Sequence, residues 1–251
     1  VVGPMDSSPA VAGNLVYVGL RGGNILALDA ATGDQQWRFE TGQAIMGSFT
    51  VVDGALYVGS TDHRIYSLDA QTGELRWTRD TTNGVITSPA FDQGIVVVGA
   101  KDDELYMIDA SNGTLRYQVN VGTTVDTSPT LVGDIAYVVT RAGNVMAFDY
   151  KQKDIPFQKA AWGIWFQFWV WNMAPTPAPP PGLIWGVRMR ESVRGDLATD
   201  GERLFVATTA GVLHAFDLET GEVIWKVEGL DSLRSSPIVS GDTIVQVAEN
   251  G

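Results

Sequence analysis

The chain has 251 residues, 45% of them hydrophobic, which is enough for one large all-β domain with a sizeable core. Its net charge of −12 argues against a nucleic-acid partner, because the phosphates of such a partner would be repelled. The sequence has no cysteine, so disulfides, thiolate metal sites and cysteine nucleophiles are excluded together.

The first predicted unit consists of four short strands joined by tight turns. Gly13, Gly22 and Gly33 mark the turns, and the runs between them are rich in β-formers. Turn residues at intervals of about ten predict an antiparallel meander of hairpins. The expected strands cover residues 8–11, 15–19, 25–29 and 35–39.

This unit recurs with a period of 40 residues, and the fifth copy follows the fourth after 68. Each copy has an aspartate at the end of a strand and an aromatic residue eight positions later. All copies but the fourth also have a glycine in the turn between them; the fourth has Lys153 there. The repeat residues are Asp29, Gly33, Trp37, Asp69, Gly73, Trp77, Asp109, Gly113, Tyr117, Asp149, Phe157, Asp217, Gly221 and Trp225.

Four-stranded antiparallel units of this length, set side by side, are the blades of a β-propeller. We therefore predict an all-β propeller with five near-complete blades and a partial sixth that begins at Ser236. Because the sixth unit lacks its last two strands, we expect an incomplete ring that is part of a larger one.

The repeat residues have structural tasks that need no ligand. The aspartate accepts hydrogen bonds from the backbone of the following turn, and the glycine supplies the positive φ that the turn requires. The aromatic ring packs against the neighbouring blade. Since five equivalent carboxylates, one per blade, cannot all form one active site, we expect all of them to be structural.

An insertion interrupts the repeat and divides the chain into residues 1–159 (blades one to four), 160–189 (insertion) and 190–251 (blade five and partial blade six). It holds five of the eight tryptophans, followed by a proline-rich run at 175–181. The aromatic run is too short to cross a bilayer as a helix. The candidate partner-binding residues are Trp162, Trp165, Phe166, Phe168, Trp169, Trp171 and Trp185.

Three interpretations of the insertion remain open. It folds back on its own propeller, it inserts into a partner protein, or it contacts a membrane interface through residues 160–187, where tryptophan prefers to lie. We favour the protein partner, because exposed tryptophan and phenylalanine clusters serve as interface anchors.

Residues with the spacing of a catalytic or metal site are not found. His63 and His214 are the only histidines, and neither has a metal ligand at a suitable spacing. The acidic turn at 101–104 lacks the alternating ligand positions of a calcium loop. We therefore predict no catalytic, cofactor-binding or metal-binding residue.

The segment from Ala27 to Trp37 resembles the repeat of the pyrroloquinoline-quinone-like β-propeller family, and residues 67–77 and 215–225 match it nearly as well. That family contains quinone-dependent alcohol and sugar dehydrogenases. It also contains non-enzymatic members, such as the propeller lipoprotein of the bacterial outer-membrane barrel-assembly machinery. The resemblance implies an extracytoplasmic protein, periplasmic or at the cell surface.

The function that we expect is a non-catalytic scaffold for protein–protein interaction, docked through the insertion to a larger, membrane-bound assembly. The alternative is a quinone-dependent dehydrogenase, or a fragment of one, with pyrroloquinoline quinone and calcium as cofactors. Several such enzymes have an adjacent-cysteine pair, which this chain lacks. A third, weaker hypothesis is a ligand-sensing ectodomain.

Overall fold

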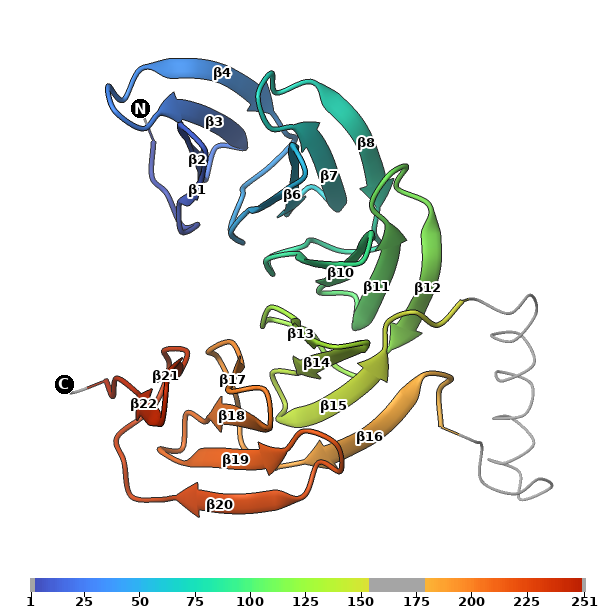
Figure 1. Ribbon diagram of the computed structural model, residues 1–251, viewed down its shortest axis with the longest axis vertical. Helices are drawn as coiled ribbons and strands as arrows, with labels where there is room; N and C mark the ends of the chain where they lie inside the picture. Colours follow the sequence, from blue (N-terminus) through green and yellow to red (C-terminus); the bar gives the residue numbers. More distant parts are fainter. Residues whose placement is uncertain (1–2, 154–178, 250–251) are drawn as a thin grey trace.

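A computed structural model describes residues 3–153 and 179–249. This part of the chain forms antiparallel sheets, five with four strands and one with two, and the prediction of an all-β propeller is confirmed (Figure 1). Across these two ranges, no helix is long and apolar enough to cross a membrane.

The first three blades are complete four-stranded meanders in which each strand pairs with the next. Blade one contains β1 (Ala10–Ala12), β2 (Leu15–Gly19), β3 (Asn24–Asp29) and β4 (Gln35–Glu40). Blade two contains β5 (Thr50–Val52), β6 (Ala55–Ser60), β7 (Arg64–Asp69) and β8 (Leu75–Asp80). Blade three contains β9 (Ala90–Asp92), β10 (Ile95–Gly99), β11 (Glu104–Asp109) and β12 (Leu115–Asn120).

The remaining blades follow the same order of strands. Blade four contains β13 (Thr130–Val132), β14 (Ile135–Val139), β15 (Asn144–Asp149) and β16 (Leu183–Arg188). Blade five contains β17 (Ala198–Thr199), β18 (Arg203–Ala207), β19 (Leu213–Asp217) and β20 (Val223–Val227). The sixth sheet contains β21 (Ile238–Ser240) and β22 (Thr243–Val245).

The blades follow one another along an arc, with the first blade at one end and β21 and β22 at the other (Figure 1). The short first strands β1, β5, β9, β13, β17 and β21 lie on the inside of this arc. The fourth strands β4, β8, β12, β16 and β20 form its outer rim. Each fourth strand contains a β-bulge directly before the repeat aromatic. Such bulges protect exposed sheet edges from pairing with other chains.

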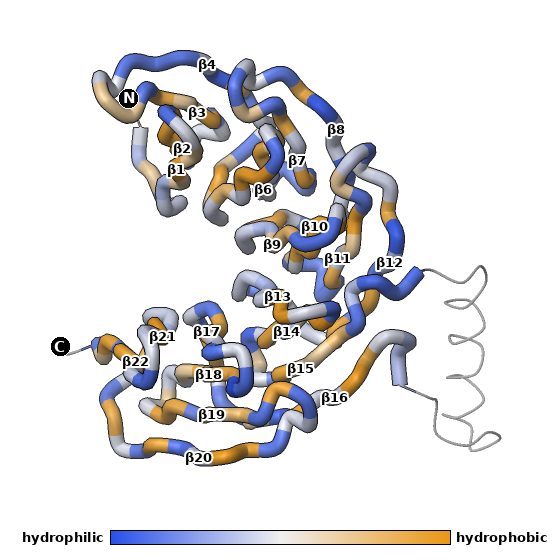
Figure 2. The backbone as a smooth tube through the Cα atoms, viewed as in Figure 1, coloured by the Kyte–Doolittle hydropathy of each residue, from blue (hydrophilic) through white to orange (hydrophobic). Residues whose placement is uncertain are grey.

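The core consists of layers between neighbouring blades. In the first layer, Tyr17 and Trp37 of blade one pack with Leu56, Val58 and Leu68 of blade two. Figure 2 shows hydrophobic stretches on the central strands of the blades and hydrophilic turns between them. Because both faces of a middle strand are covered, such strands are continuous hydrophobic runs; all five residues of β10 are buried.

The predicted position of the insertion is wrong. We placed it at 160–189, between blades four and five, but β16 pairs with β15 and completes blade four. Trp185 lies opposite Ala147, as Trp37 lies opposite Ala27 in blade one. The insertion therefore lies within blade four, between its third and fourth strands, and the boundary at residue 189 falls beyond a strand of that blade.

Candidate functional site

The repeat aspartates bind their own turns. Asp29 Oδ1 accepts hydrogen bonds from the backbone N–H groups of Ala31 and Thr32, both at 2.9 Å. Asp69 and Asp217 accept the same pair from the residues two and three positions later. Asp109 and Asp149 each accept one from the residue two positions later.

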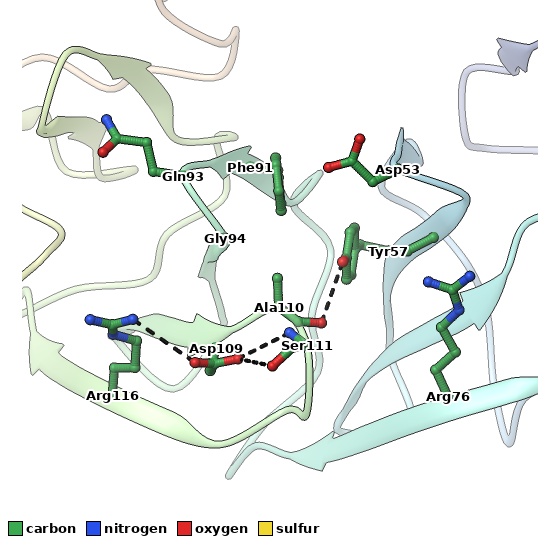
Figure 3. A pocket seen from close by; sticks show the side chains of 11 residues that line it. Asp53, Tyr57, Arg76, Phe91, Gln93, Gly94, Asp109, Ala110, Ser111 and Arg116 are labelled. Atoms are coloured by element: carbon green, nitrogen blue, oxygen red, sulfur yellow. Dashed lines mark hydrogen bonds and ion pairs between the residues drawn. The ribbon is translucent and has the colours of Figure 1, made fainter.

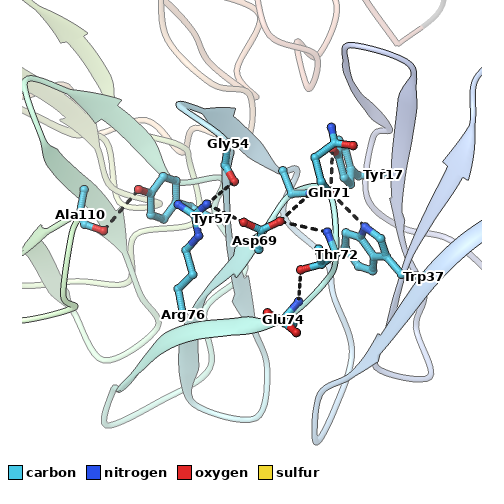
Figure 4. Close-up of polar contacts among 11 residues, drawn as sticks. Tyr17, Trp37, Gly54, Tyr57, Asp69, Gln71, Thr72, Glu74, Arg76 and Ala110 are labelled. Atoms are coloured by element: carbon cyan, nitrogen blue, oxygen red, sulfur yellow. Dashed lines mark hydrogen bonds and ion pairs between the residues drawn. The ribbon is translucent and has the colours of Figure 1, made fainter.

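These turn contacts favour the ionised carboxylate. Backbone hydrogen bonds from Thr32 and Ala31 lower the pKa of Asp29 below its usual value. At Asp69, the Arg76 guanidinium donates to Oδ2 at 2.7 Å, and together with the Thr72 N–H it lowers the pKa to about 2 (Figure 4). These carboxylates are engaged in holding turns, which leaves them poorly suited to proton transfer near neutral pH.

The repeat tryptophans connect neighbouring blades through one recurring hydrogen bond. In blades one, two and four, the indole Nε1–H donates to the carbonyl of the residue that follows the aspartate in the next blade. The bonds are Trp37 to Ala70 at 3.0 Å, Trp77 to Ala110 at 2.8 Å, and Trp185 to Leu218 at 2.9 Å. The turn glycine of the next blade lies directly against the ring: a Cβ on Gly73 would be 2.7 Å from Trp37.

Tyrosines on the second strands donate to the same carbonyls, a role that we did not predict. The hydroxyl of Tyr17 donates to Ala70 at 3.1 Å, that of Tyr57 to Ala110 at 3.4 Å, and that of Tyr137 to Leu218 at 3.1 Å. The signal was present in the sequence, since each tyrosine precedes the repeat aspartate of its own blade by twelve residues.

A chain of hydrogen bonds also connects the blades just before their first strands. Ser48 N–H donates to Ser88 Oγ at 2.9 Å, and Ser88 N–H donates to Ser128 Oγ at 3.1 Å. Ser128 N–H donates to Asp196 Oδ1 at 2.6 Å, and Asp196 N–H donates to Ser236 Oγ at 2.8 Å. The serines of the Ser-Pro pairs at 88–89, 128–129 and 236–237 therefore join successive blades through their hydroxyls, a role that we did not predict from the sequence.

Trp185 is not a partner-binding residue, which corrects our prediction. Its side chain is buried, with 9% exposed, and its indole is bonded to Leu218 of blade five. Trp185 is therefore the repeat aromatic residue of blade four, the position predicted for Phe157. Phe157 lies outside the described residues, and so do the other predicted partner-binding residues, Trp162, Trp165, Phe166, Phe168, Trp169 and Trp171.

The two histidines and the acidic turn show no metal-binding arrangement. His214 is buried and its Nε2 lies 3.3 Å from Glu191 Oε2, whereas His63 is exposed in a turn with φ of 70°. In the acidic turn, Asp102 Oδ2 accepts hydrogen bonds from Thr82 N–H and from the Tyr106 hydroxyl. In the part of the chain that the structure describes, no three or more histidine, cysteine or acidic side chains group as metal ligands would.

A pocket of about 450 Å³ lies between blades two and three (Figure 3). Tyr57 and Phe91 form an aromatic part of its lining; their rings are nearly parallel, with centroids 5.9 Å apart and planes at 14°. Arg76 of β8 and Arg116 of β12 line its sides. Asp53 lies at its edge, on the tip of the β5–β6 hairpin. Burial raises the pKa of Tyr57, so its hydroxyl keeps its proton at neutral pH.

Comparison with known proteins points to one family. The sequence matches a family model described as the outer membrane protein assembly factor BamB over residues 2–88, 81–162 and 176–251. No curated protein matches the sequence.

Two solved structures are similar in fold. The computationally designed Ika8 protein aligns with a TM-score of 0.75 and 17% identity, over 98% of this chain and 69% of that one. BamB from Moraxella catarrhalis aligns with a TM-score of 0.63 and 15% identity, over 98% of this chain and 83% of that one. At these identities the likeness establishes a common fold and leaves the function to be argued from this chain's residues.

Proposed function

The chain belongs to the family of the outer membrane protein assembly factor BamB, and on that premise we propose that it is a non-catalytic, extracytoplasmic scaffold that binds other proteins. The description of the family supports a place in a membrane-associated protein assembly. It also supports an extracytoplasmic location, at the periplasmic side of an outer membrane or at the cell surface.

The main support for this proposal is that the polar groups of the repeat are engaged in structural hydrogen bonds. The aspartates hold their own turns, and the tryptophans and serines bond adjoining blades. Polar groups arranged in this way make a rigid support. The lowered pKa values of the repeat aspartates Asp29, Asp69, Asp109 and Asp217 make these carboxylates poor general acids or bases near neutral pH. A rigid arc of blades with a large outer rim is suited to present binding surfaces to several partners.

The insertion is the first binding surface that we propose. Its flanking residues Lys153 and Pro179 belong to the connection between β15 and β16, and β16 is the rim strand of blade four. A segment that departs from the rim is positioned to reach a partner without disturbing the layers between blades. The proposed anchors are Trp162, Trp165, Phe166, Phe168, Trp169 and Trp171. Large aromatic side chains of this kind dominate the binding energy of many interfaces.

Replacement of the insertion by a turn of the chain's own repeat tests this function. Residues 151–182 are exchanged for the four residues Gln71 to Glu74, so that Tyr150 is retained and blade four receives the connection of blade two. Photo-crosslinking from position 165 in membranes of the source cells should give protein adducts, and the exchanged variant should no longer co-purify with those proteins. Crosslinking from Arg79, on the rim strand of blade two, is the matched control.

Two results would contradict the proposal. One is an exchanged variant that associates with the same proteins as the unmodified chain. The other is dye-linked oxidation of alcohols or sugars after addition of pyrroloquinoline quinone and calcium, which would favour the dehydrogenase alternative.

A further inference from the structure

The junction between blades two and three differs from the other junctions in its side chains. The differences lie at positions where the residue type varies from blade to blade, so the fold does not prescribe them. The aromatic pair of this junction is Tyr57 and Phe91, whereas the equivalent pairs contain a smaller aliphatic residue or threonine at the second position. Those equivalents are Val51 after Tyr17, Leu131 after Val97, Thr199 after Tyr137, and Val239 after Phe205. Since the propeller is built without Phe91 at every other junction, this ring does something that the fold does not require.

The two sides of the pocket are also specific to this junction. Arg76 and Arg116 are the bulge residues of their rim strands. The same position is Gln36 in blade one, Ile184 in blade four and Ile224 in blade five. Only the junction of blades two and three therefore has a guanidinium on both sides, among the junctions within the described residues.

Arg116 has a donor without an acceptor. Its side chain is 28% exposed, and its Nη1 lies 3.9 Å from Asp109 Oδ2, a long ion pair. Its Nε–H is buried and has no hydrogen-bond partner within the described part of the chain. Arg76, by contrast, is held by Gly54 O and Asp69 Oδ2, both at 2.7 Å. Because this Nε–H is closed to solvent, a ligand oxygen can reach Arg116 only at the exposed part of its guanidinium, where the pairing with Asp109 is long and therefore weak.

The charges favour an uncharged ligand group. Arg76 and Arg116 are balanced in the lining by Asp53 and Asp109, and the whole chain carries a charge of −12. A carboxylate ligand would face this negative field, whereas the amide groups of a peptide present carbonyl oxygens and N–H groups without net charge. The pocket volume of about 450 Å³ is within the range of specific binding sites.

We propose that this pocket binds an extended segment of a protein partner, with an apolar side chain against Phe91 and a backbone carbonyl oxygen bonded to Arg116. This inference rests on the proposed function, because it gives the scaffold a second, peptide-binding surface. The pocket lies between blades two and three, and the insertion departs from blade four, so the two surfaces can be tested separately.

Titration of the ¹⁵N-labelled chain with the neutral tripeptide N-acetyl-Gly-Phe-Gly-amide tests the proposal. The Nε–H signal of Arg116 and the amide signals of Gly94 and Ala110 should shift and saturate together. Phe91→Val and Arg116→Gln should each weaken binding at least fivefold. Both variants copy residues that the chain itself has at equivalent positions, Val51 and Gln36, so both should fold. Arg79→Gln, on β8 outside the pocket lining, should bind as the unmodified chain does.

The proposal is overturned by the absence of saturable shifts with the tripeptide, or by wild-type binding in both pocket variants. It is also overturned if N-acetylglutamate binds and the tripeptide does not, since the site would then be an anion site. The chain with residues 151–182 replaced should bind the tripeptide normally. A negative result of the tripeptide titration would therefore contradict the pocket proposal alone. A negative result of the exchange of residues 151–182 would contradict the proposed role of the insertion alone.

Discussion

At the scale of single residues, the backbone carbonyl that follows each repeat aspartate holds two blades together. Ala70 O accepts from Trp37 Nε1 at 3.0 Å and from the Tyr17 hydroxyl at 3.1 Å. The carbonyl can face the preceding blade because the turn is fixed by Asp69 and closed by Gly73, whose φ is 75°. Aspartate, glycine and tryptophan thus act together. The aspartate and the glycine shape the turn of one blade, and the tryptophan of the preceding blade donates a hydrogen bond to a carbonyl in that turn.

Substitution of the turn glycine separates backbone strain from blade packing. Gly113→Ala places a Cβ 2.8 Å from the Trp77 ring in a backbone with φ of 73°. Gly94→Ala is the matched control, because its φ is 76° and nothing lies within 4 Å of the added atom. We expect the control to lose about 1–2 kcal/mol of unfolding free energy from the left-handed backbone alone. Gly113→Ala should lose about 1–3 kcal/mol more through overpacking. Equal losses in chemical denaturation would disprove a packing role.

The lowered pKa of Asp69 predicts a dependence of stability on pH. Its folded-state pKa of about 2 is below the value of about 3.9 in an unfolded chain. Such a group stabilises the fold above pH 4, and this stabilisation is lost as the pH falls from about 4 to about 2. The urea midpoint should therefore drop over this interval, and Asp69→Asn should start lower at neutral pH and drop less.

Asp80→Asn is the comparison for this experiment. Asp80 also pairs with an arginine, Arg64, but its side chain is 81% exposed on the rim. Exposed ion pairs contribute little to stability, so this variant should follow the unmodified chain. Parallel curves for Asp69→Asn and the unmodified chain would exclude Asp69 as a source of the acid sensitivity.

At the scale of elements, the sequence predicted the regular blades and misplaced the strand next to the insertion. Phe157 follows Asp149 by eight residues, the spacing of the repeat, and we assigned it on that count. Trp185 precedes Asp217 by 32 residues, as Trp37 precedes Asp69 and Trp77 precedes Asp109. The two counts compete in the sequence. The structure supports the second, because Trp185 pairs with Ala147 and its indole is bonded to Leu218 O.

Exchange of residues 151–182 for Gln71 to Glu74 should leave blade four intact. Shortening this connection lowers the entropic cost of closing the loop and thereby stabilises the fold by about 1–2 kcal/mol. The exchange also removes the hydrogen bond from the Tyr117 hydroxyl to Pro181 O, worth about 1 kcal/mol. The two effects nearly offset each other, so the unfolding free energy should equal or slightly exceed that of the unmodified chain. A loss above about 2 kcal/mol in urea denaturation would mean that the insertion supports the fold.

At the scale of the whole molecule, the blades form a row in which each contacts its neighbours. The serine and tryptophan bonds join only adjacent blades, as in other repeat proteins. The sequence predicts such a row, because each bond joins residues at fixed repeat positions. It could not predict the pocket between blades two and three, which arises where Phe91 and two arginines from different repeats meet.

Local stability should differ between the middle and the end of this row. Every residue of β10 is buried between neighbouring blades, whereas Thr243 and Val245 of β22 are exposed. Segments with few buried contacts open locally, without unfolding of the whole molecule. The amide of Ile244, which lies in the β21–β22 ladder, should therefore exchange with deuterium at least roughly 100-fold faster than that of Val97, about 2.7 kcal/mol in opening free energy. Exchange followed by mass spectrometry or NMR measures both amides in one experiment. Equal rates would show that the row opens as a single unit, in which the bonds between blades couple β22 to the centre of the molecule.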